Sequence, residues 1–447
     1  MLRRAVYFFI FLAIVAENPA DGVYDHQWST FMEPVGDFLF RNLPIKIPPI
    51  DFVILGIFLA AVRSPGAKAN RARAFDYAVY VCLGSLLLPI SWGLLTGGDA
   101  RQVFWQMHQL MMVPVLTLVF TWALRMPRDL RGLGQAVVAA ALYRALMAII
   151  FRFVIVPDLL VKPAHMTTHS DTMLFVLGLV IFLSRFLEKR TLKDLTFLLG
   201  FGGFLALAIL INNRRLAYVT FAVSVVILYV LFPAGRAKRV VNYVLLASLP
   251  LLVGYVAVGW ESSSTLFKPA RSIATMFGQH EDTSSETRNI ENYNLIQTWK
   301  HNPILGTGWG HEYDEVNVAY SIAEAFPQYR YIPHNSALGL WAFTGLVGAT
   351  GVWSIFSIGV FFGVRTYRAA TAPEHRAAAA ASVCMILAYV IQAYGDMGFA
   401  SWTGAVLTAA SLSTIHRLSV AVGAWPKATR PVPRAPAVSA ASEAPRA

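Results

Sequence analysis

About twelve apolar stretches recur along the chain, most of them near the roughly 20 residues that a helix needs to cross the hydrocarbon of a membrane. With 56% hydrophobic and 14% charged residues, the chain is too apolar for a soluble protein. The sequence therefore predicts an all-α polytopic membrane protein. The stretches lie near residues 4–18, 49–63, 75–95, 104–124, 133–156, 172–187, 194–212, 216–233, 240–259, 335–364, 377–397 and 402–420.

The first stretch has two interpretations, because Arg3 and Arg4 precede a short apolar run, as they would in a secretory signal peptide. No small-x-small cleavage site is clear, and Glu17-Asn18-Pro19 follows abruptly. We expect this stretch to be retained as a helix.

Every second connection is rich in lysine and arginine, which the positive-inside rule places in the cytoplasm. Both termini are then inside, and the long connection from residue 261 to 333 is outside. The chain divides into spans 1–9 (1–259), an external loop domain (260–334), spans 10–12 (335–420) and a disordered cytoplasmic tail (421–447) rich in Ala, Pro and Ser. The basic connections hold Arg63, Lys68, Arg71 and Arg73; Arg125, Arg128 and Arg131; Arg185, Lys189, Arg190 and Lys193; Arg236, Lys238 and Arg239; Arg365, Arg368 and Arg376.

The net charge of +12 does not indicate nucleic-acid binding, because the basic residues fall in short groups between apolar runs rather than on one face or arm. Cys82 and Cys384 each lie within an apolar run, which excludes a disulfide framework and a cysteine metal site. His108, His165 and His169 lack a metalloprotease-type spacing, so no metal site is expected.

The external loop is long enough to need helices of its own. Ser284 or Ser285 can cap a helix that His301-Asn302-Pro303 can end, and apolar side chains recur at spacings of three within it. Arg288 then lies in the first turn of this helix.

Further along the loop, Gly306 and Gly308 favour a tight turn with close backbone approach. The aromatic residues that follow suit either sugar rings or simple packing at the membrane surface, and both interpretations are open. These residues are Tyr313, Tyr320, Phe326, Tyr329 and Tyr331.

Arg214 and Arg215 follow Asn212 and Asn213 at the external end of one apolar stretch, and the next stretch begins at once. Adjacent arginines on the side where positive charge is normally avoided indicate an anionic partner. The alternative is that both side chains reach phospholipid headgroups.

Arg144 and Arg152 lie inside the fifth span, about two turns apart and so near one face of the helix. Two interpretations are open for them. They pair with an acid such as Asp171 or Asp396, or they line a cavity.

His334 precedes the tenth span, next to Pro333. A histidine at a membrane boundary is usually a hydrogen-bonded interface residue, but several arginines are predicted on the same side at the same depth. The sequence does not identify a carboxylate that orients its imidazole. Candidates by location alone are Glu312, Asp314, Glu315 and Glu324, and the neighbouring arginines are Arg214, Arg215, Arg288 and Arg330.

Three motifs, in this order and topology, resemble the O-antigen ligase and O-antigen polymerase superfamily of bacterial inner-membrane proteins. The resemblance covers roughly residues 200–365 by motif. The matching motifs are Asn213-Arg214-Arg215, Arg288 followed by Asn302-Pro303-Ile304-Leu305-Gly306-Thr307-Gly308, and His334-Asn335 followed by Gly345 and Gly348.

The resemblance implies a glycosyltransferase with an undecaprenyl-pyrophosphate-linked glycan as donor, a glycan or lipid A core as acceptor, and no metal or other cofactor. It also implies the bacterial inner membrane, with the active site facing the periplasm. Arg215 and Arg288 are expected to hold the pyrophosphate, because guanidinium groups bind phosphate oxygens through two charged hydrogen bonds.

An imidazole titrates near neutral pH, so His334 can remove the acceptor proton in an inverting transfer, or it can bind phosphate as imidazolium. Asn335 either orients His334 or starts the next helix, and both roles are open. The residues expected to bind substrate are Arg214, Asn335, Arg330 and Arg152.

Other functions compete with this one. The motifs do not separate a ligase from a repeat-unit polymerase. A transporter of lipid-linked glycans also has about twelve spans, but its charges would sit at the bilayer midplane between internal repeats, and no such repeat is visible. An accessory protein without activity is a further alternative.

Overall fold

The computed structural model describes residues 1–17, 32–40, 47–64, 72–125, 127–163, 165–262, 264, 267, 270–271, 283–318 and 328–425. Within these ranges the chain is helical and no strand occurs, which confirms the predicted all-α membrane fold. The main helices are α1 (Leu2–Val15), α2 (Glu33–Phe40), α3 (Pro49–Arg63), α4 (Arg73–Leu95), α5 (Ala100–Ala123), α6 (Pro127–Ile150), α7 (His169–Lys189), α8 (Leu192–Phe197), α9 (Gly203–Asn212), α10 (Arg215–Leu231), α11 (Arg236–Gly259), α13 (Thr283–His301), α14 (Ser336–Ala369), α15 (Pro373–Gly395) and α16 (Trp402–Ala421).

Short irregular helices continue some of these elements. The π-helix η1 (Phe151–Ile155) and the 3₁₀ turn η2 (Val156–Asp158) extend α6, the π-helix η3 (Leu198–Gly202) joins α8 to α9, and η5 (Gly398–Ala400) precedes α16. In the described residues, eight helical segments are long and apolar enough to cross a membrane. α1, α3 and α10 are shorter. Within the described residues each predicted apolar stretch is nevertheless mostly helical, and only residues 421–425 of the predicted tail lie within the described ranges.

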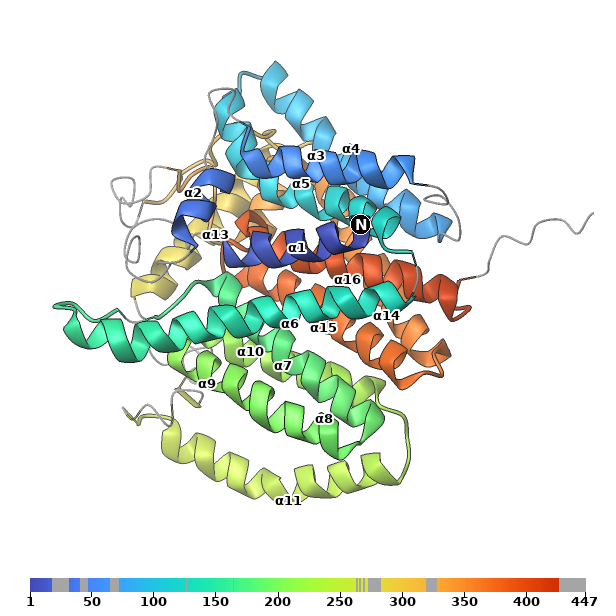
Figure 1. Ribbon diagram of the computed structural model, residues 1–447. Coiled ribbons are helices and arrows are strands. Elements are labelled where there is room, and N and C mark those ends of the chain that lie inside the picture. The colour runs from blue at the N-terminus through green and yellow to red at the C-terminus, as the bar shows by residue number, and fades with distance from the viewer. Residues whose placement is uncertain are drawn as a thin grey trace, which may run out of the picture.

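The long helices form one bundle (Figure 1). α2 and α13 lie at one end of the bundle, whereas α1 begins and α16 ends at the opposite end. α11 lies at the periphery, with its apolar side chains exposed. α1 packs against α6 and α16, and Arg3 pairs with Asp129 of α6 at 2.6 Å. The first stretch thus forms a helix that packs within the bundle.

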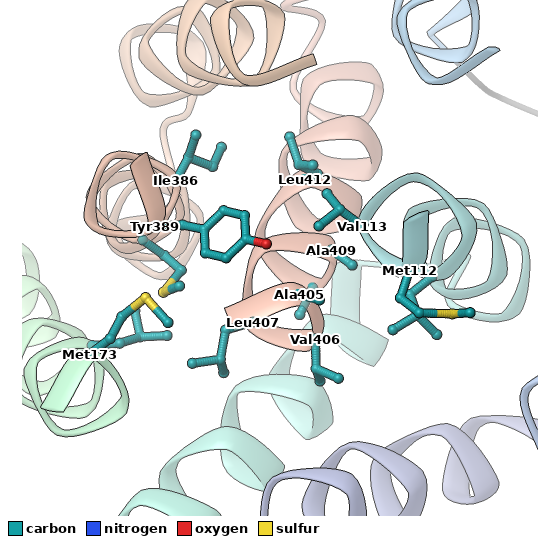
Figure 2. Packing of buried hydrophobic residues seen from close by; sticks show 14 of the residues in the cluster. Met112, Val113, Met173, Ile386, Tyr389, Ala405, Val406, Leu407, Ala409 and Leu412 are labelled. Carbon is teal, nitrogen blue, oxygen red and sulfur yellow. The ribbon is translucent and has the colours of Figure 1, made fainter. Parts of the chain in front are cut away.

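The hydrophobic core centres on α16, whose residues from Trp402 to Val420 are all buried. Small residues line α16, so neighbouring helices approach it closely. A methyl group added to Gly404 would lie 2.6 Å from the Tyr389 ring of α15. Figure 2 shows this ring directed at α16, with Met173 of α7 nearby. α16 is therefore the inner helix against which α5, α7, α14 and α15 pack.

α14 is interrupted at Gly345, where φ is 58° and ψ is −162°. The backbone groups freed by this break are bonded by the loop segment 303–308, which lies against it. In a membrane such groups must be satisfied within the protein, because no water is there to bond them. The bonds run from Thr307 N to Ala342 O (3.1 Å), Gly308 N to Phe343 O (2.9 Å), Leu346 N to Pro303 O (2.8 Å) and Val347 N to Ile304 O (3.1 Å).

Two glycines let this segment lie so close. Gly306 and Gly308 have φ values of 69° and 87°, in the left-handed region that favours glycine. A methyl group on Gly306 would lie 2.4 Å from the backbone of Phe343, and one on Gly308 would lie 2.3 Å from that of Gly93 in α4. The predicted tight turn and close backbone approach are confirmed.

Replacing Gly345 by alanine should destabilise the protein by about 2–4 kcal/mol, because the left-handed backbone disfavours an L residue and the added methyl lies 2.4 Å from the Ile304 backbone. Thermal unfolding of the purified protein in detergent measures the effect. Gly254→Ala on exposed α11 is the matched control, since its methyl meets nothing within 4 Å. Equal melting temperatures for the two variants would contradict the proposed fit.

Candidate active site

His334 lies directly before α14 and is held by a carboxylate that the sequence did not single out. Glu291 of α13 accepts from the His334 backbone N–H at 3.1 and 3.2 Å, and its Oε1 lies 3.3 Å from His334 Nδ1. Glu291 is buried, whereas 29% of the His334 side chain is exposed. The contact orients the imidazole through Nδ1 and leaves Nε2 for another partner.

The acids that lie close to His334 in the sequence have other partners. Glu312 pairs with Arg330 at 2.6 Å, Asp314 lies 2.8 Å from His301 Nδ1, and Glu315 accepts from the Tyr329 hydroxyl at 3.0 and 3.1 Å. The fourth candidate, Glu324, lies outside the described residues. Three of the four acids therefore brace the loop rather than His334.

Asn335 begins α14. Its Oδ1 accepts from Leu338 N at 3.0 Å as the N-cap, and its Nδ2 donates to Asn292 Oδ1 of α13 at 2.9 Å. The helix-starting role is thus confirmed. The bond to Asn292 adds a second tie between α13 and the start of α14, next to that of Glu291.

α13 is a polar helix, and buried polar side chains fix it in place. Asn294 donates to Asn317 O at 2.8 Å and accepts from the N–H groups of Val316 and Asn317 at 3.1 and 3.0 Å. Arg288 lies one turn before Glu291, so both project from nearly the same face. The predicted helix is present and ends at His301, but it begins at Thr283. Ser284 and Ser285 are therefore within the helix rather than its cap, and Arg288 lies in the second turn.

The turn between α9 and α10 is built around the buried side chain of Asn212. Its Oδ1 accepts from Met166 N and Thr167 N at 3.1 and 2.7 Å, and its Nδ2 donates to Thr168 O and Thr172 Oγ1 at 3.3 and 2.7 Å. These bonds join the turn to the segment that enters α7.

The chain reverses at Asn213, whose φ of 59° asparagine tolerates better than most residues. Arg214 caps α10 and donates from Nε to Thr167 O at 2.9 Å, and Arg215 is the first residue of α10. The two cations therefore stand at the N-terminus of a helix.

His169 and Asp396 link this arginine turn to His334. His169 begins α7, and its Nε2 lies 3.5 Å from Asp396 Oδ2. Asp396 O in turn accepts from the hydroxyl of Ser336 at 3.4 Å. His169 also interacts electrostatically with Arg214 and Arg288. Residues in or next to α7, α10, α13, α14 and α15 thus lie at the end of the bundle where α13 lies (Figure 1).

The same end is packed tightly around the end of α15. A methyl group on Gly395 would lie 2.9 Å from Leu216 Cδ1, so the residue after Arg215 contacts the residue before Asp396. The structure therefore places Arg214 and Arg288 near the His169–Asp396 pair. It also joins His334 and Asn335 to α13 through Glu291 and Asn292.

Arg330 and Arg152 differ from the other predicted residues. Arg330 pairs with Glu312 and donates from Nε and Nη2 to Tyr313 O at 3.2 and 2.8 Å, which makes it a brace between two parts of the loop. Arg152 is exposed on the π-helical turn η1. Arg144, by contrast, forms a buried pair with Asp171 at 2.7 and 2.9 Å, the pairing interpretation weighed above.

Burial raises the pKa of Tyr313 above its ordinary value, and the nearby carboxylates of Glu291 and Glu315 raise it further by a smaller amount. Its phenol is therefore neutral near pH 7 and cannot act as a base.

His108, one of the histidines considered as a metal ligand, lies 2.9 Å from Asp51. Within the described ranges, no group of three or more His, Cys, Asp or Glu side chains is arranged to hold a metal ion.

A family model matches part of the chain, whereas no curated protein matches it. The family is described as O-antigen ligase, and its model matches residues 200–353, about a third of the chain. The matched region contains the arginine turn, α13, the 303–308 segment, His334 and the break in α14. The match over residues 200–353, which hold most of this site, supports the O-antigen ligase superfamily.

Proposed function

We propose that the protein transfers a glycan from an undecaprenyl-pyrophosphate carrier to an acceptor hydroxyl, as an O-antigen ligase does. The family match supports ligase-like activity in general. The observation that carries the finer proposal is the buried Glu291 holding His334 from the same helix that presents Arg288. In this proposal His334 is the base, Glu291 orients it, and Arg288 binds phosphate.

In this reaction the acceptor oxygen attacks the anomeric carbon of the donor sugar, and the bond from that carbon to the pyrophosphate oxygen breaks. The electron pair leaves with the pyrophosphate, and the acceptor proton passes to Nε2 of His334. Glu291 stabilises the imidazolium that forms, because its carboxylate faces Nδ1. Attack opposite the leaving group inverts the anomeric configuration.

Arg215 and Arg288 bind the pyrophosphate in this proposal, with Arg214 as the alternate. The N-termini of α7, α10 and α14 begin with His169, Arg215 and Ser336, so their dipoles add positive potential at the same end of the bundle. Preformed cations stabilise the charge that builds on the leaving pyrophosphate. No nucleotide is needed, which suits a site outside the cytoplasm.

The proposed orientation puts this site in the periplasm and both termini in the cytoplasm. The positive-inside pattern supports it, as does the placement of the start of α1 and the end of α16 opposite α13 (Figure 1).

The proposed acceptor is lipid A core. A deletion strain that carries polymer on the carrier lipid and unmodified core supports a ligase, whereas core bearing a single repeat indicates a polymerase.

Replacing His334 by glutamine should lower the rate of glycan transfer by about 10²–10⁴-fold, because the base is lost. Glu291→Gln should lower it by about 10–100-fold, since an amide orients the ring but does not stabilise imidazolium. Transfer by the purified protein from carrier-linked glycan to lipid A core, followed on gels, measures both.

His301→Gln is the matched control, because His301 lies in the same region but pairs with Asp314 and is mostly exposed. If the His334→Gln variant transfers glycan at the wild-type rate, His334 is not the general base. Movement of carrier-linked glycan across vesicles without transfer would instead indicate a transporter.

Arg288→Lys should raise the KM for the donor at least about tenfold, because an ammonium cannot hold two phosphate oxygens in the fork of a guanidinium. Arg330→Lys should instead lower the melting temperature and leave the KM nearly unchanged, since Arg330 braces the loop through Tyr313 O. Transfer kinetics at several donor concentrations and thermal unfolding separate the two. Unchanged donor KM in Arg288→Lys would contradict its phosphate role.

A further inference from the structure

A cavity lies at the end of the bundle opposite the site that holds His334. It has a volume of about 1040 Å³ and lies between α6, α7, α8, α15 and α16. Its lining residues include the first turns of α6 and α15 and the last turns of α7 and α16. These turns mark the end where α1 begins (Figure 1).

The inner part of the cavity is apolar, and its depth matches one leaflet of a bilayer. Along α6 it extends from Arg128 to Leu142, about 21 Å at 1.5 Å per residue. Half of a hydrocarbon thickness of about 30 Å is about 15 Å, so a cavity of this depth that begins at the headgroups spans one leaflet. Side chains such as Val138, Leu177, Phe201 and Leu407 line it. Such a space suits acyl chains better than a water-soluble ligand.

The mouth of the cavity is positively charged. Five cations and two carboxylates line it, which leaves a net charge of +3. The carboxylates are already engaged: Asp194 with Arg185 at 2.8 Å, and Glu374 with Lys189 at 2.6 Å. The three cations that remain are Arg128, Arg131 and Lys193.

These three side chains are exposed at the mouth, and no ion pair engages them within the ranges that the structure describes. The N-termini of α6 and α15 also lie at the mouth, and their dipoles favour an anion there. A phosphate group at this depth would thus meet positive charge from three helices.

We propose that this cavity binds an anionic glycerophospholipid of the cytoplasmic leaflet. Its acyl chains occupy the apolar interior, and its phosphate lies among Arg128, Arg131 and Lys193. Basic pockets between membrane helices on the cytoplasmic side recognise anionic headgroups in this way. The lipid fills the space between α6 and α8 and so holds α6 against the rest of the bundle. The proposal does not depend on the glycan-transfer site.

Native mass spectrometry of the full-length protein in detergent tests the proposal. The probes are phosphatidylglycerol and phosphatidylcholine with the same acyl chains, and a polyprenyl phosphate as competitor. Phosphatidylglycerol should bind at least about fivefold more tightly than phosphatidylcholine, because the charged mouth discriminates between the headgroups. Equal binding of the two phospholipids overturns the proposal, and so does preferred binding of the polyprenyl phosphate.

Two variants separate the headgroup from the acyl chains. The triple variant Arg128→Gln/Arg131→Gln/Lys193→Gln should lose the preference for phosphatidylglycerol. Gly134→Leu should weaken the binding of both phospholipids, because a side chain on Gly134 extends into open space in the cavity. The control Arg365→Gln/Arg368→Gln removes two cations from the end of α14, which do not line the cavity. Thermal unfolding verifies that each variant is folded. An equal loss of binding in the control overturns the proposal.

Discussion

The backbone hydrogen bonds between the 303–308 segment and the break in α14 are the constraint on which the rest of the structure depends. An unpaired N–H or C=O group in hydrocarbon costs several kcal/mol, so a membrane helix can open only where another segment bonds its free groups. Here that segment directly follows α13, and Ser336 at the start of α14 lies nine residues before Gly345. One junction therefore places both Glu291 and His334.

Sequence periodicity and glycine chemistry predicted much of this architecture. Long apolar stretches, the polar helix α13 and the turn at Gly306 and Gly308 each follow from local rules: segment length, capping and backbone freedom. The break at Gly345 does not. A glycine inside an apolar run is common in membrane helices, and only the arrival of residues 303–308 distinguishes this one.

The partner of His334 could not be predicted because it depends on how distant segments fold together. Glu291 lies 43 residues before His334 and is one of several acids in a polar region. The nearer acids Glu312, Asp314 and Glu315 have their own partners in the folded loop. The position of Arg330 in the loop predicts that it lies beside the other arginines. Its ion pair with Glu312 depends on how the loop folds, and so the sequence does not predict it.

The arginine turn is organised by Asn212, whose amide bonds four groups and carries no charge. An amide does not titrate, and its short bonds in a buried setting are little weakened by dissolved ions. In the proposed orientation this turn faces a compartment whose acidity and ionic strength follow the surrounding medium. The affinity of the arginines for a phosphate would vary with that medium, whereas the hydrogen bonds of Asn212 that position the arginines would not.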